Sequence, residues 1–130
     1  MSANPILLSL EDALEVHRDQ VERYGGSTGI RDLGLLESAL AMPQAGIAGQ
    51  YFHADLYEMA AAYLFHIVKN HPFVDGNKRT GTMAAYAFLG LNGIQVVAPP
   101  RDLEALVLAV ATGKSQKSDV AVFLRKHARC

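Results

Sequence analysis

The chain has 130 residues, of which 50% are hydrophobic, and it carries 12 basic and 13 acidic side chains, for a formal net charge of −1. This length predicts one domain, residues 1–130, with enough apolar residues to form its own core. The balanced charge excludes a general nucleic-acid coat and a polybasic membrane binder, so no direct nucleic-acid binding is expected. The charge is nevertheless uneven. Residues 1–65 hold three basic and nine acidic side chains, whereas residues 66–130 hold nine basic and four acidic ones, which raises the question of an anionic ligand.

The cysteine content and the N-terminal sequence indicate the compartment. The single cysteine, Cys130, cannot form an internal disulfide, and the first residues lack a basic segment followed by an apolar run and a cleavage site. These features predict a cytoplasmic, reduced setting. No apolar stretch reaches the roughly 20 residues needed to cross a bilayer, so no membrane association is expected.

Helix start and stop signals divide the first half of the chain. Ser9 is the predicted N-cap of a helix whose apolar positions recur near the 3.6-residue period until Gly25–Gly26 ends it. Asp32 is the predicted cap of a short helix that ends before Pro43. Residues 43–53, which contain two glycines and no hydrophobic period, are expected to form a surface loop.

The second half begins with two strongly apolar helices. Asp55 followed by Glu58 has the form of a capping box, and the helix that it opens is apolar nearly all the way round. The helix predicted over residues 78–91 has the same character. Such helices belong in the centre of a bundle. Pro99–Pro100 opens a further helix, and Ser118 is the predicted cap of the last one. The expected fold is therefore all-α, a single-domain bundle of about six helices with a polar loop between the two central ones.

This polar connector between the central helices reads HPFVDGNKR, residues 71–79, and is more polar than a short turn requires. Asn77 is the predicted N-cap of the second central helix, so that the amides of its first turn would attract an anion. Lys78 and Arg79 lie in that turn, where cations are unfavourable beside the positive end of the helix dipole unless an anion is bound. This local conflict predicts a phosphate site.

Other residues of the connector have the chemistry that phosphoryl transfer needs. Asp75 is a hard oxygen ligand suited to Mg²⁺ bridging phosphates, although a carboxylate here could also cap the helix. His71 can take a proton from a hydroxyl near neutral pH. Gly76 allows the backbone to approach a ligand closely, and Phe73 is expected to anchor the loop in the core.

The connector resembles the signature of the Fic/Doc family. Lys78, where most Fic enzymes have glycine, makes the chain similar to the Doc (death-on-curing) branch, and the segments around Gly25–Asp32 and Leu35–Ala39 are also similar to that branch. The resemblance implies an all-α Fic fold and transfer of part of a nucleoside triphosphate to a protein hydroxyl. It implies the following roles: His71 as general base, Asp75 as Mg²⁺ ligand, and Gly76, Asn77, Lys78 and Arg79 as the phosphate-binding residues.

Resemblance to the Doc branch implies the toxin of a toxin–antitoxin module. Such toxins are Mg²⁺- and ATP-dependent kinases that phosphorylate a threonine of elongation factor Tu, block translation and are silenced by a Phd antitoxin. Fic proteins mostly transfer AMP, and their adenylyltransferases usually have a second arginine where this chain has Thr82, which favours the kinase. Gly76 is shared with Fic enzymes, so the orientation of the nucleotide stays open. Self-inhibited Fic proteins carry an internal helix with a glutamate followed by glycine or asparagine. No glutamate of this chain is followed by either residue, so inhibition is expected from a partner.

Several alternatives accompany these predictions. An idle module that holds a partner peptide beside the connector is the hypothesis from a different functional class. His66 is expected to be a satisfied core histidine, whereas His53 and His127 are expected to be solvated. The basic residues toward the C-terminus, such as Arg125, are expected to form a solvated face.

Overall fold

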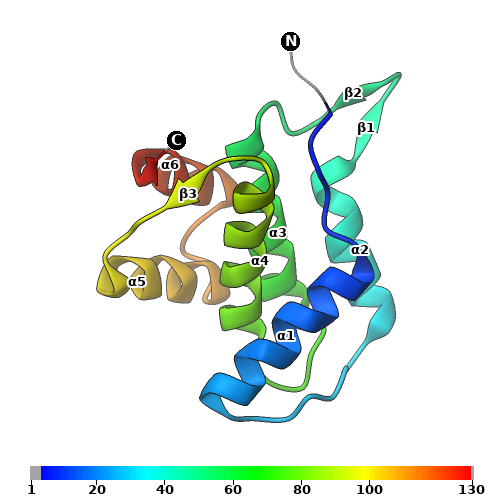
Figure 1. Ribbon diagram of the computed structural model, residues 1–130, viewed down its shortest axis with the longest axis vertical. Coiled ribbons are helices and arrows are strands. Elements are labelled where there is room, and N and C mark those ends of the chain that lie inside the picture. Colours follow the sequence, from blue (N-terminus) through cyan, green and yellow to red (C-terminus); the bar gives the residue numbers. More distant parts are fainter. Residues whose placement is uncertain (1–3, 130) are drawn as a thin grey trace.

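The computed structural model describes residues 4–129, so Cys130 lies outside the described residues. This part of the chain folds into six α-helices with two small antiparallel strand pairs, β1–β2 and β3–β4 (Figure 1). The expected all-α architecture is confirmed. In chain order the elements are α1 (Leu10–Tyr24), α2 (Leu33–Ala41), the 3-10 helix η1 (Met42–Gln44), β1 (Gly46–Ile47), β2 (Gln50–Tyr51), α3 (Leu56–Asn70), α4 (Asn77–Leu91), β3 (Gln95–Val96), α5 (Pro100–Ala111), α6 (Lys117–Lys126) and β4 (Ala128–Arg129).

Three helix starts are capped as the sequence predicts. The side chains of Ser9, Asp32 and Asp55 each accept a hydrogen bond from the backbone N–H three residues further on. The box at Asp55 is incomplete, because the Glu58 carboxylate accepts from Ala54 N instead. Local side-chain chemistry therefore sets where these helices begin.

Two predictions in the first and last parts of the chain are wrong. Ser118 does not cap α6, because the carboxylate of Asp119 accepts from Gln116 N, Gln116 is the N-cap and the helix begins at Lys117, two residues earlier than a cap at Ser118 predicts. Residues 43–53 lie mostly at the surface, as predicted, but they are not an irregular loop, because they include the end of η1 and the β1–β2 hairpin. Gly46 permits this hairpin, since a Cβ there would lie 2.1 Å from Gln50 O on the opposite strand.

The core surrounds α3, which packs against α2, α4 and α6, while α1 lies across α4 (Figure 1). α3 and α4 approach closely at Gly81, where a Cβ would lie 3.0 Å from Val68 Cγ2 and 3.1 Å from Leu64 O. This contact brings the end of α3 beside the start of α4. The connector of residues 71–76 therefore lies at one end of the bundle, next to the loop that follows α1. Within the described residues no helix is long and apolar enough to span a membrane.

Candidate active site

The backbone of the connector turns through two residues with left-handed conformations. His71 ends α3 with φ 52° and ψ 53°, and Gly76 precedes α4 with φ 79°. Gly76, not Asn77, is thus the N-cap residue, and the predicted N-cap is wrong. A Cβ at Gly76 would come only to 3.8 Å from His17 and Val21, so the backbone conformation and not crowding favours glycine.

The Asn77 side chain points into the fold instead of toward the start of the helix. It is 4% exposed; Oδ1 accepts from Phe73 N and Nδ2 donates to Phe73 O, each at 2.9 Å. Nδ2 also lies 3.1 Å from His71 Nδ1. Because these contacts use the whole amide, Asn77 can offer an anion only its backbone N–H.

The first turn of α4 combines free amides with two cations. No side chain caps this helix, and its first backbone bond runs from Thr80 N to Gly76 O, which leaves the amides of residues 77–79 without intrahelical acceptors. Lys78 and Arg79 are exposed, and neither forms an ion pair with a residue in the range 4–129. This end of α4 therefore has the positive potential that binds an anion.

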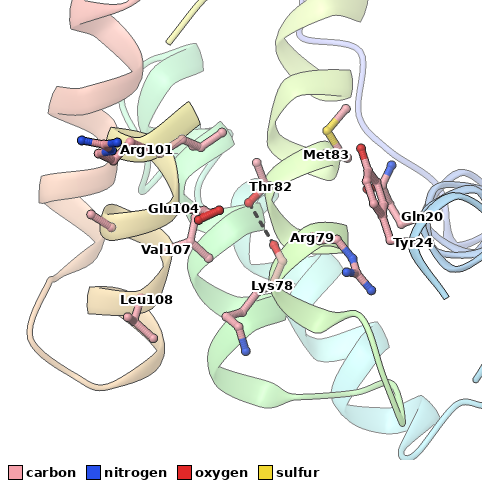
Figure 2. A pocket seen from close by; sticks show the side chains of 12 residues that line it. Gln20, Tyr24, Lys78, Arg79, Thr82, Met83, Arg101, Glu104, Val107 and Leu108 are labelled. Carbon is pink, nitrogen blue, oxygen red and sulfur yellow. Dashed lines mark hydrogen bonds between the residues drawn. The ribbon is translucent and has the colours of Figure 1, made fainter. Parts of the chain in front are cut away.

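Arg79 contacts the end of α1. Its guanidinium lies 5.0 Å from the centre of the Tyr24 ring, and Nη2 donates to Gly25 O at 3.3 Å. Figure 2 shows Arg79 and Tyr24 facing one another, with Lys78 directed away from them.

A cavity of about 650 Å³ lies beside this turn, between α1, α4 and α5 (Figure 2). Its lining includes Tyr24, Lys78, Arg79, Thr82 and Met83. Thr82 is 8% exposed and its hydroxyl donates to Lys78 O at 2.9 Å. The α4 wall of the cavity thus has basic groups at its start and Thr82 in place of a cation one turn further along, while Arg101 and Glu104 line the α5 wall.

Asp75 is exposed, and its carboxylate is held by the loop after α1. Oδ2 accepts from Ser27 N at 2.8 Å, so this carboxylate does not cap α4. Gly26 accommodates the approach, because a Cβ there would lie 3.0 Å from Asp75 Cβ. Oδ1 makes no hydrogen bond with any described residue. In residues 4–129 no group of three or more His, Cys, Asp or Glu side chains could hold a metal ion by itself.

His17, which sequence reasoning missed, supports the connector from α1. Its ring is 2% exposed, stacks on Phe73 with 3.7 Å between centroids, and contacts Asp75 O through Nε2 at 2.8 Å. Because a carbonyl oxygen only accepts, Nε2 of His17 carries a proton. The signal in the sequence was a polar residue on the apolar face of a helix. Phe73 is fully buried, which confirms its predicted role as an anchor.

Arg31 holds the other side of the connector and was also missed. Its side chain donates to His71 O at 2.7 Å and to Asn70 O at 2.9 Å, which satisfies carbonyls at the end of α3. The backbone amides of Arg31 and Asp32 both donate to Pro72 O. The loop of residues 25–32 is therefore a second layer that fixes the position of His71, whose own side chain is exposed.

The remaining histidines differ from expectation. His66 is partly buried but not satisfied, because its Nε2 has no hydrogen-bond partner among the described residues, and burial lowers its pKa to about 4. His53 is partly buried rather than solvated; burial and the nearby Lys117 ammonium, 3.1 Å from Nε2, lower its pKa. His127 packs against a ring of α6. Arg125 pairs with Asp55 at 2.6 Å, so it is not simply solvated.

The fold and the connector agree with comparisons to known proteins. The sequence model of the Fic/DOC family matches residues 7–89, and the chain belongs to this family. Among its relatives, "Protein kinase doc" of Escherichia phage P1 is 38% identical over 119 residues, which cover 92% of this chain and 93% of that protein. "Toxin Doc" of Mycolicibacterium smegmatis is 47% identical over 75 residues, which cover 58% of each chain.

Proposed function

We propose that this chain is a Doc-type toxin of a toxin–antitoxin module. In this proposal it acts in the cytoplasm as a Mg²⁺- and ATP-dependent kinase that phosphorylates a threonine of a translation factor, elongation factor Tu, and so blocks translation. The observation that carries the proposal is the start of α4, which no side chain caps and where Lys78 and Arg79 are exposed. His71 lies at the other end of the connector that leads into this turn. The names of the two relatives, a protein kinase and a toxin, support the same class.

The residues around α4 fit Mg²⁺–ATP. Asp75 keeps one carboxylate oxygen free of protein donors, and no larger acidic cluster is present in the described chain. This matches Mg²⁺ sites in which one or two carboxylates and the substrate phosphates share the ion. When bound, Mg²⁺–ATP supplies the phosphoryl group, and the metal neutralises charge on the phosphates.

The chain's own residues then have distinct tasks. Gly76, the free amides of residues 77–79 and the side chains of Lys78 and Arg79 hold the phosphates and stabilise negative charge on the transferred group. His71 takes the proton of the target hydroxyl. The buried position of Thr82, with its hydroxyl bonded to the backbone, supports a site without the second arginine of AMP transferases.

The test is transfer of label from ATP to proteins of a bacterial lysate. We expect label from the γ position, on phosphothreonine in elongation factor Tu, and its loss in His71→Ala; His127→Ala is the matched control. Label from the α position alone would replace the kinase by an AMP transferase. Full transfer by His71→Ala would exclude His71 as the base. A protein that binds a partner but shows no ATP binding by calorimetry would be an idle module.

We also propose that a Phd-like antitoxin occupies the groove between α1, α4 and α5. The cavity at Lys78 and Arg79 shares Gln20 and Met83 with a second cavity of about 700 Å³ along α1. That second cavity is lined by three carboxylates: Asp12, Glu15 and Asp19. The groove therefore suits a segment that is acidic near the start of α4, basic near α1 and apolar between them, and such a segment would cover the phosphate-binding cations.

Substitution in the middle of the groove tests this partner site. Met83 is 37% exposed on α4, and Met83→Glu should prevent neutralisation by the co-expressed antitoxin while labelling by ATP continues. Val122→Glu, at a position 62% exposed on α6, is the control and should be neutralised like the wild type. Neutralisation of Met83→Glu at wild-type antitoxin levels would rule out this groove.

A further inference from the structure

The amide of Asn77 has an orientation that the structure defines. Phe73 N donates to one amide atom and Phe73 O accepts from the other, both at 2.9 Å, so the first atom must be Oδ1 and the second Nδ2. Turning the amide over would place two donors together and two oxygens together, in an environment where Asn77 is only 4% exposed. Two hydrogen bonds would become two repulsive contacts.

This orientation determines the hydrogen bond to His71. The first Nδ2 hydrogen is used by Phe73 O, and the second faces His71 Nδ1 at 3.1 Å. An amide N–H only donates, so His71 Nδ1 accepts through its lone pair. A neutral imidazole carries one proton, which must then be on Nε2. Nε2 forms no hydrogen bond with any residue between 4 and 129, and the His71 side chain is exposed.

We propose that Asn77 is a positioning residue that holds uncharged His71 as the Nε2–H tautomer. The catalytic meaning of this inference rests on the proposed function above. In the free protein the exposed nitrogen is then a hydrogen-bond donor and not a proton acceptor. With the ring in this orientation, a target hydroxyl meets a base at Nε2 only after the ring loses the Nε2 proton to water and gains one on Nδ1, with no change in its charge.

The tautomer change requires Asn77 and His71 to separate, by movement of either side chain. A proton on Nδ1 would face the Nδ2–H of Asn77, so the contact between the two side chains must break first. The bonds of Asn77 to Phe73 would break with it if the amide turned over. Activation of His71 is thereby coupled to the geometry of the connector that also precedes the phosphate-binding turn.

Nitrogen NMR of the imidazole tests the inference without ATP or target. Long-range ¹H–¹⁵N correlation spectra are recorded on the full chain at a pH where the rings are uncharged, and the His71 signals are assigned by their absence in His71→Gln. We expect the shift of an unprotonated nitrogen at Nδ1 and of a protonated nitrogen at Nε2. The reverse pattern, or two averaged shifts, would overturn the proposal. The expected pattern together with absent kinase activity would leave this inference standing and contradict only the proposed function.

A matched pair of variants extends the test. Asn77→Asp replaces the donor by an acceptor and should move the His71 proton to Nδ1. Asn92→Asp is the control, because Asn92 makes the same two bonds to one residue, Ile6, away from any histidine. Its spectrum should keep the wild-type His71 pattern. Asn77→Asp also loses the donor to Phe73 O, so its fold is checked by spectral dispersion. A folded Asn77→Asp protein with the wild-type tautomer would refute the role of Asn77.

Discussion

Replacing His17 by alanine should weaken the fold and the connector together. The imidazole stacks on Phe73 at 3.7 Å with an angle of 7° between the rings, and its Nε2–H donates to Asp75 O at 2.8 Å. Alanine removes the ring, leaves a cavity against Phe73 and takes the only side-chain donor from that carbonyl among the described residues. The connector would then be held on this side by the Arg31 side chain, by the backbone amides of Arg31 and Asp32, which donate to Pro72 O, and by Gly29 O, which accepts from Val74 N.

The size of this effect follows from its two parts. Truncating a large buried aromatic side chain to alanine costs about 3–5 kcal/mol, and the smaller imidazole falls at or below the lower end. The lost hydrogen bond adds about 1 kcal/mol, since Asp75 is exposed and its carbonyl can bond to water instead. We expect a total of about 2–4 kcal/mol. For a domain of this size the melting temperature should fall by roughly 6–15 °C.

Thermal denaturation followed by circular dichroism measures the loss. His17→Phe separates the two parts, because it keeps a stacked ring but has no N–H, and it should lose only about 1 kcal/mol. Its phosphoryl transfer should still be slower than that of the wild type at temperatures where it is fully folded. Arg18→Ala, at the exposed neighbouring position, should change stability by about 0.5 kcal/mol or less. If His17→Ala has the same melting temperature as Arg18→Ala, or if His17→Phe is as unstable as His17→Ala, the reasoning is wrong.

Three further predictions concern other parts of the fold. Gly81→Ala should be less stable in urea than Gly90→Ala by about 1–3 kcal/mol. The Cβ at position 81 would meet α3 at Leu64 O, whereas a Cβ at position 90 meets nothing within 4 Å. Equal urea midpoints for the two variants would contradict the close packing of α3 on α4. Burial lowers the pKa of His66 to about 4 from 6.5, so the unfolded chain is protonated first and stability should fall as pH drops from 6.5 to 4; an unchanged decline in His66→Gln would exclude this. Arg31→Gln removes two charged donors from the end of α3 and should reduce label transfer about tenfold or more. Transfer at the wild-type rate would contradict the role of the loop of residues 25–32 in positioning His71.

The helix starts could be predicted because their determinants are local. Ser9, Asp32 and Asp55 each bond to an amide three residues away, so a short stretch of sequence contains both partners. The same rule failed at Asn77, whose amide is bonded to Phe73 and His71. Propensity for a cap position says only what a side chain can do, and packing decides which partner it takes.

Much of the support around the connector, from α1 and from the loop of residues 25–32, could not be predicted, because its contacts join residues far apart in the chain. His17 and Asp75 are separated by 58 positions, and Arg31 and His71 by 40. A polar residue on the buried face of a helix signals that it has a partner but does not identify it. The connector itself was identified because its residues are consecutive. The geometry that controls His71 comes from elements whose approach only the folded chain defines.

The conflict between the cations and the start of α4 is partly relieved in the fold. Gly25 is the C-cap of α1, so Gly25 O belongs to the negative end of that helix, and Arg79 donates to it while covering the Tyr24 ring. Arg79 thus lies between the negative end of α1 and the positive end of α4. Its bond to Gly25 O is long, at 3.3 Å, and the side chain is exposed, so a phosphate on α4 would draw Arg79 away at little cost. Lys78 has no such substitute partner among the described residues. Of the nine basic residues in the second half of the chain, Lys78 and Arg79 are the two in this turn, and an anion bound there would offset the remaining repulsion between the Lys78 ammonium and the helix dipole.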